Sequence, residues 1–214
     1  MKKLVSIIGM VVLATLVMMV TPTQAQTKQQ KKDAKKETKR LTKAGYLTMG
    51  LPLHQQIEEY YAKMSEKDED GMPKYLSETN MAVGNSFSAA KMEAINIAKT
   101  RLAGQIQTTV MAEAKISLGN STLSSEDAAS VTKALEKSTQ LIAQKLSKVV
   151  IAQEYYKILN NKNYEVHVVL LYNTKNVKDM LIQDAKAELE KELKDFKPEH
   201  EKLLEEAVKC GVKQ

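Results

Sequence analysis

The stretch GNSFSAAKMEAINIAKTRLAGQIQTTVMAEA, residues 84–114, carries the strongest structural signal in this chain of 214 residues. Its apolar side chains recur at steps of three and four residues, the spacing of one face of an α-helix: Phe87, Ile95, Ala98, Leu102, Ile106 and Val110. Asn85 or Ser86 can cap this helix, because a short side-chain oxygen accepts a hydrogen bond from an otherwise unpaired amide. Alanines beside the apolar stripe allow a close approach to a sheet. We therefore predict a helix over about residues 87–116, packed against strands.

Alternating apolar residues predict the strands that this helix covers. Residues 74–83 read as one strand, and a change from helical to two-residue periodicity predicts two more at 149–159 and 164–172. The asparagines between these two favour a hairpin, since asparagine tolerates a positive φ. Helical spacing predicts the remaining elements at about 53–66, 125–147, 175–196 and 199–210. This order predicts an α+β fold, a small antiparallel sheet with long helices packed on one face.

The first 25 residues have the pattern of an export signal. Two lysines precede an apolar run from Leu4 to Val20, and Thr23 and Ala25 provide the small residues of a cleavage site. The run has about the minimum length that spans a bilayer, so an uncleaved anchor is the alternative. We predict cleavage before Gln26 and a location in the periplasm or outside the cell.

Basic residues concentrate just after the predicted cleavage site. Residues 26–43 carry eight lysines and arginines, two acids and almost no apolar side chains. Such a segment buries too little apolar surface to offset the entropy of ordering, so we predict a basic flexible leader. Residues 44–214 are slightly acidic and long enough for a single α+β domain. The leader is suited to anionic envelope material such as lipid phosphates, whereas its lack of aromatic residues argues against nucleic acid.

The sequence shows no constellation of catalytic or metal-binding residues. Its three histidines, His54, His167 and His200, lack a second histidine, cysteine or carboxylate at a spacing typical of a metal site. Nucleophile elbows, phosphate-binding glycine loops and dinucleotide fingerprints are missing as well. The acidic run at 66–73 reads as a turn with solvated carboxylates rather than a calcium loop. We therefore predict no enzyme activity, no cofactor, and no catalytic, cofactor-binding or metal site.

One cysteine and two pairs of tyrosines are the remaining candidates. Cys210 cannot form a disulfide within the chain, so it is either a small apolar residue near a helix end or half of a disulfide between chains. The adjacent tyrosines at 60–61 and 155–156 place one ring on each side of their element. The outward ring is a candidate interface aromatic, with ordinary amphipathic packing as the alternative.

Residues 74–172 resemble the twenty-kilodalton envelope lipoprotein (LPP-type) family. The shared features are the glycine and polar step before the long helix, the alanine-rich helix with Leu102 and Ala103, and the closing hairpin VVIAQEYYKILNNKNYEVHVVLLYN, residues 149–173. The stretch KRLTKAGYLTMGLPLHQQIEEYY, residues 39–61, is similar to uncharacterised exported proteins of gut-type bacteria. The resemblance implies a non-catalytic envelope protein and offers no catalytic residues. The chain lacks the lipid-bearing cysteine of that family, which favours a soluble periplasmic state.

These observations predict an exported, non-catalytic cell-envelope protein with a structural or protein-interaction role. Its expected partner is an envelope protein or the anionic envelope surface, with no nucleic acid and no transmembrane span in the mature chain. The alternative is a small-molecule or lipid-binding periplasmic module, with an apolar pocket between sheet and helices. The sequence leaves the oligomeric state open.

Overall fold

The computed structural model describes residues 28–69, 71–121, 123–146, 149–193 and 197–212, so the predicted export signal at 1–25 lies outside the described residues. Its elements are α2 (Lys28–Lys43), α3 (Leu53–Met64), β1 (Tyr75–Gly84), α4 (Phe87–Gly119), α5 (Ser125–Lys145), β2 (Val150–Ile158), β3 (Tyr164–Asn173), α6 (Thr174–Glu192) and α7 (Pro198–Gly211). This architecture confirms the predicted α+β class, and the predicted helices and strands lie within a few residues of their expected ends. Within these ranges, every helix is too short or too polar to cross a lipid bilayer.

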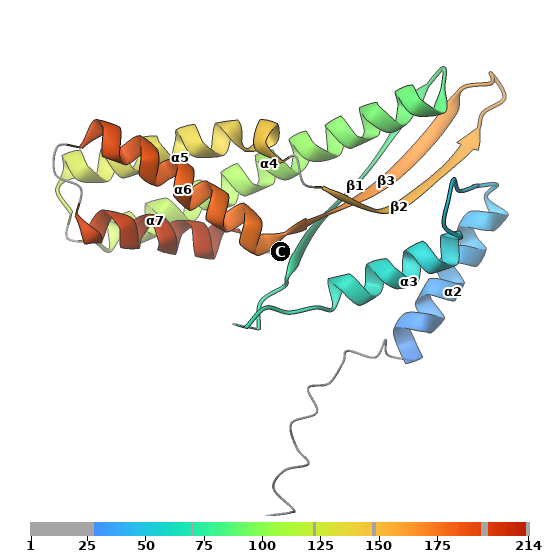
Figure 1. Cartoon of the computed structure of the whole chain (residues 1–214), viewed down its shortest axis with the longest axis horizontal. Helices are drawn as coiled ribbons and strands as arrows, with labels where there is room; N and C mark the ends of the chain where they lie inside the picture. The colour runs from blue at the N-terminus through green and yellow to red at the C-terminus, as the bar shows by residue number, and fades with distance from the viewer. Residues whose placement is uncertain (1–27, 70, 122, 147–148, 194–196, 213–214) are drawn as a thin grey trace, which may run out of the picture.

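The three strands form one antiparallel sheet in the order β1–β3–β2, with β3 in the middle (Figure 1). Val168 and Leu170 on β3 are completely buried, as predicted, but Val169 and Leu171 on the opposite face are also buried, so the second half of β3 is covered on both faces. The predicted hairpin between β2 and β3 is present, with one difference. Lys162, rather than an asparagine, has the positive φ of 66°, while the Asn161 side chain accepts a hydrogen bond from the amide of Asn163 at 3.1 Å.

Helix α4 covers one face of the sheet. Ser86 caps its start by accepting a hydrogen bond from the amide of Ala89 at 3.2 Å, as predicted. Ala90, Ala94 and Ala98 are completely buried, because their small side chains let the helix and the sheet approach closely. The 33 residues of α4 span about 50 Å, so the helix extends beyond the sheet. There it packs against α5 and α7, and α6 contacts both of these helices (Figure 1).

Helices α2 and α3 form a second layer on the opposite face. Neighbouring tyrosines of β2 point to the two sides of the sheet, so Tyr156 packs against the core under α4 and Tyr155 packs with α2 and α3. The sheet therefore lies between α4 and the α2–α3 pair, as Figure 1 shows. This layer adds to the predicted arrangement, in which only the helices on one face were expected.

The prediction of a flexible leader at residues 26–43 is wrong for its described part, because Lys28–Lys43 forms helix α2. A cluster of buried side chains joins this helix to α3 and β2: Ala34, Leu41, Leu53, Ile57 and Tyr155. All the lysines of α2 remain exposed, so forming the helix does not desolvate their charges. Average composition misled the prediction, because two side chains spaced on one helical face suffice when a neighbouring helix and the sheet cover them.

Candidate functional site

The outer edge of β2 is partly closed by the chain's own N-terminal segment. The amide and carbonyl of Leu47 pair with those of Tyr156, at 2.7 and 2.8 Å. The buried side chain of Gln56 accepts a hydrogen bond from the amide of Glu154 at 2.7 Å and donates one to the carbonyl of Leu51 at 2.7 Å. These contacts occupy edge groups of β2 that another strand would otherwise reach.

This cover ends near the start of β2, where a groove lies open. Ala152 is the extra residue of a β-bulge and has no partner on β3, whereas Ile151 and Gln153 beside it do. The groove, of about 290 Å³, is lined by residues of α3, α4, β2 and the segment before α3. Four of its apolar side chains are more than a third exposed: Met49 (54%), Leu51 (49%), Val150 (50%) and Ile151 (36%). Exposed apolar side chains gathered around a concave surface are typical of a binding site, and we call this one the β2 groove.

Charged residues at the rim of the β2 groove have partners within the protein. Lys91 of α4 forms an ion pair with Glu154 of β2. Glu59 accepts a hydrogen bond from a glutamine on the same helix at 2.8 Å, and the ammonium of Lys63 lies 5.1 Å from the centre of the Tyr75 ring. One of these contacts is an ion pair and the other two are weaker, so the groove combines exposed apolar side chains with a charged rim.

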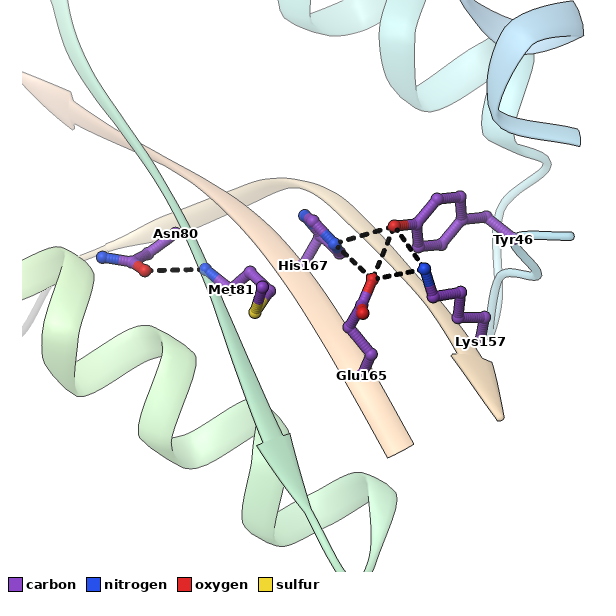
Figure 2. Close-up of polar contacts among 6 residues, drawn as sticks. All are labelled: Tyr46, Asn80, Met81, Lys157, Glu165 and His167. Atoms are coloured by element: carbon purple, nitrogen blue, oxygen red, sulfur yellow. Dashed lines mark hydrogen bonds and ion pairs between the residues drawn. The ribbon is translucent and has the colours of Figure 1, made fainter. Parts of the chain in front are cut away.

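Four polar side chains converge on the face of the sheet that carries α2 and α3 (Figure 2). Glu165 Oε1 accepts a hydrogen bond from the Tyr46 hydroxyl at 2.6 Å and lies 3.0 Å from both Lys157 Nζ and His167 Nε2. We call these four residues the Glu165 cluster. Tyr46 belongs to the segment after α2, whereas the other three belong to β2 and β3. The cluster therefore ties the N-terminal segment to the sheet.

Hydrogen bonding sets the charges of the Glu165 cluster. Burial alone raises the pKa of Glu165, but hydrogen bonds from Tyr46, His167 and Lys157 outweigh it and lower that pKa to about 2. Burial and the bond to Glu165 raise the pKa of the Tyr46 phenol, and hydrogen bonds to Glu165 and Tyr46 raise the pKa of Lys157. At neutral pH the carboxylate and the ammonium are charged and the phenol is protonated. The ion pair between Glu165 and Lys157 and the hydrogen bond from the Tyr46 phenol therefore form a structural contact between the segment after α2 and the sheet.

Aromatic rings complete this contact. The His167 ring stacks on Tyr155, with centroids 4.9 Å apart and planes 12° apart. The Tyr46 ring meets each of them edge-on at 5.1 Å, and Lys157 Nζ lies 4.9 Å from the centre of the Tyr46 ring. Held in this way, the segment after α2 places Leu47 against the edge of β2 and brings the residues that follow it to the β2 groove.

The three histidines lie on different elements. His167 is partly exposed on β3, as expected for a sheet histidine, and belongs to the Glu165 cluster. His54 Nε2 lies 3.4 Å from the carboxylate of Glu58, one helical turn away. His200 is completely buried, and its Nδ1 accepts a hydrogen bond from the amide of Lys197 at 3.1 Å. In the described ranges, no three side chains of the metal-binding types come together.

The candidate interface tyrosines are mostly packed inside the protein. Tyr155 is 8% exposed, and the ring of Tyr156 meets Phe87 edge-on at 5.1 Å, so the packing alternative describes this pair. The hydroxyl of Tyr60 lies 3.2 Å from the hydroxyl of Ser77. Tyr60 also lines the β2 groove, which leaves it as the tyrosine best placed to contact a ligand.

The other two sequence candidates have local settings. Cys210 is half-buried and lines a surface cleft of about 380 Å³ beside Ile116 of α4. In the acidic run at 66–73, of which residue 70 lies outside the described residues, the Asp68 carboxylate accepts a hydrogen bond from the amide of Met72 at 2.8 Å, as in a turn. Neither setting adds a ligand or a reactive group to the β2 groove.

Sequence reasoning found only part of this site. The alternation of β3 placed Glu165 and His167 on the same face, but the sequence gives no sign that Tyr46, 119 positions before Glu165, meets both of them. Gln56 was missed because a glutamine on a helix surface carries no signal of burial. Comparison with known protein families, with curated proteins and with solved structures finds no match to this chain. The resemblance to the LPP-type family therefore stays a prediction.

Proposed function

We propose that this chain is an exported, non-catalytic cell-envelope protein, located in the periplasm or outside the cell, whose role is to bind another protein. The observation that carries the interaction role is the β2 groove, where four exposed apolar side chains surround the uncovered start of β2. The pattern of residues 1–25 supports the location. The absence from the sequence of a nucleophile elbow, a phosphate-binding glycine loop and a dinucleotide fingerprint supports a non-catalytic role.

The geometry of the β2 groove favours an extended peptide segment as its ligand. Leu47 already pairs with β2 in antiparallel fashion, so this edge accepts a strand. Gly50, with a φ of 94°, then turns the chain away from the edge, a conformation that favours glycine. A partner strand that continues towards the start of β2 would place alternate side chains against Met49 and Ile151.

Selection of peptides by the mature chain, residues 26–214, tests this role. We expect displayed peptides with alternating apolar residues to be enriched, and Ile151→Asp to weaken their binding at least about tenfold, because it places a charge in the groove. Ile158→Asp is the matched control, since Ile158 is exposed (56%) at the other end of the same strand. Peptides that bind both variants as well as the wild type would overturn the proposal.

The location is tested separately. Fractionation of the native host, with mass measurement of the intact protein, is expected to find the chain outside the cytoplasm and beginning at Gln26. A cytosolic protein that retains Met1 would contradict the proposed export.

The exposed lysines of α2 favour a second contact, with an anionic envelope surface. We expect the mature chain to sediment with vesicles that contain phosphatidylglycerol and to be released by salt. Replacing Lys31 and Lys35 by glutamine should weaken this binding, whereas the same change at Lys115 and Lys202, also exposed, should not. Equal binding to uncharged phosphatidylcholine vesicles would rule this contact out.

The alternative of a small-molecule or lipid pocket between sheet and helices has less support. Ala90, Ala94 and Ala98 are completely buried between α4 and the sheet, so the two layers approach closely where such a pocket would lie. The clefts that residues of α3, α6 and α7 line are open to the surface and are not enclosed apolar cavities.

A further inference from the structure

The sheet has a second edge, formed by β1, and its backbone groups can be assigned from the strand pairing. Tyr156 directs its amide and carbonyl outwards to Leu47, so its neighbour Tyr155 directs its own groups inwards to His167. The amide and carbonyl of His167 therefore point to β2. Met81 lies opposite His167 on β1, so the amide and carbonyl of Met81 point away from β3. By alternation, the amides and carbonyls of every second residue from 75 to 83 also point away from the sheet.

The contacts of Met81 support this assignment. Its amide donates to the side-chain oxygen of its neighbour Asn80 at 2.7 Å, as Figure 2 shows. An amide engaged in the ladder with β3 would not need this local partner. The nitrogen of the Asn80 side chain, Nδ2, is buried and has no hydrogen-bond partner among the described residues. A buried donor without an acceptor is uncommon and costs about 1–3 kcal/mol.

The β1 edge lacks the protection that natural edge strands carry. Within the described residues, no backbone group of 75–84 bonds to a backbone outside the ladder with β3. Lysine, arginine and proline do not occur in this stretch, and Glu78 is its single charge. Met81 and Val83 are 43% and 47% exposed. A ten-residue edge of this kind is a template for another strand, unless charges, prolines or bulges block it.

We propose that β1 pairs with β1 of a second copy of this chain, antiparallel and centred on Thr79, to join two sheets into one of six strands. This pairing sets Thr79 against its own copy, and Ser77 against Met81 of the second copy. No like charges face each other, and threonine pairs are favourable across strands. The two-fold axis makes the contact self-complementary, as closed dimers require.

The same register supplies the missing partner of Asn80. It places Asn80 opposite Glu78 of the second copy on one face of the joined sheet, where rotation of the Asn80 side chain brings its Nδ2, buried in the single chain, to a carboxylate acceptor. The amide of Met81 then donates to a carbonyl of the second copy, which releases the Asn80 oxygen. This inference is independent of the β2 groove, because it concerns the opposite edge of the sheet.

Introducing a positive or a negative charge at Thr79 tests both the edge and the register. Sedimentation velocity of the mature chain over a range of concentrations, in reductant so that Cys210 cannot link two copies, is expected to show a monomer–dimer equilibrium. Thr79→Lys and Thr79→Glu should each raise the dimer dissociation constant at least about tenfold, because they set like charges opposite each other. Mixing the two variants should restore the dimer, since opposite charges then meet.

Ile158→Lys, which adds a charge to the other edge, is the control and should leave the dimer unchanged. Thermal unfolding of each variant verifies that the monomer still folds. A monomer at every concentration would overturn the proposal, and so would a dimer that both Thr79 variants leave intact. A mixture that fails to restore pairing would overturn the register centred on Thr79.

Discussion

The two edges of the sheet differ in how their outward-pointing backbone groups are hydrogen-bonded. At β2, Leu47 and the side chain of Gln56 bond to the outward backbone groups, and the Glu165 cluster holds the segment that brings Leu47 there. At β1, the only outward backbone group with a described hydrogen bond is the amide of Met81, which donates to the side chain of Asn80. The difference indicates that the β2 edge is partly closed as part of folding, at Glu154 and Tyr156, whereas the β1 edge is left available to another strand.

Gln56→Ala tests the closed edge with the largest expected effect. The substitution removes the buried side chain that bonds to the amide of Glu154 and to the carbonyl of Leu51, both in partly buried surroundings. We expect the free energy of unfolding to fall by about 2–3 kcal/mol, measured by urea denaturation. Gln55→Ala is the control, because Gln55 is exposed and should cost less than about 0.5 kcal/mol. Equal effects of the two variants would contradict the role of Gln56 at the edge.

Glu165→Ala tests how the N-terminal segment is held. It removes the acceptor shared by Tyr46, Lys157 and His167, and we expect a loss of about 2 kcal/mol in the same measurement. Exchange of the Leu47 and Tyr156 amides should also become faster, because the segment that pairs with β2 is released. Unchanged exchange at these two amides would show that Leu47 is held by something other than the cluster.

The pH dependence of stability provides a second test of the same carboxylate. The pKa of Glu165 is lowered from 4.5 to about 2 in the folded protein. As the pH falls, the Glu165 carboxylate therefore takes up a proton in the unfolded chain before it does so in the folded protein. The stabilisation is therefore complete above about pH 4.5 and is lost between pH 4.5 and 2. The difference in unfolding free energy between wild type and Glu165→Gln should shrink across this range, which isolates Glu165 from the other carboxylates. A difference that stays constant would show that the pKa of Glu165 is not lowered.

Asn80→Ala should have the smallest effect on folding. It exposes the amide of Met81 to water but also removes the buried, unbonded Asn80 Nδ2, so the two changes oppose each other. We expect a change within about 0.5 kcal/mol in urea denaturation. Together with Gln56→Ala, this variant measures the asymmetry of the two edges. A loss as large as that of Gln56→Ala would mean that the β1 edge is also closed by the fold.

Local patterns predicted most of the fold. The spacing of apolar residues in α4 reflects burial on one face, and the structure confirms it. The alternation in β3 holds only for its first half, because Val169 and Leu171 on the other face are buried as well. The leader at 26–43 was predicted wrongly because burial of Ala34 and Leu41 depends on α3 and β2, which lie elsewhere in the sequence. Long-range contacts could not be predicted for the same reason. The hydrogen bond between Tyr46 and Glu165, and the order of strands that makes β1 and β2 the edges, depend on how distant segments pack.

Amide hydrogen exchange at low and high protein concentration tests the contrast between the edges most directly. We expect the amides of Glu154 and Tyr156 to be protected at every concentration, because Gln56 and Leu47 bond to them within one chain. We expect the amides of Thr79 and Val83 to exchange fast in dilute protein and to become protected as the concentration rises. Equal protection of both edges in dilute protein, or exchange at β1 that does not depend on concentration, would contradict this contrast.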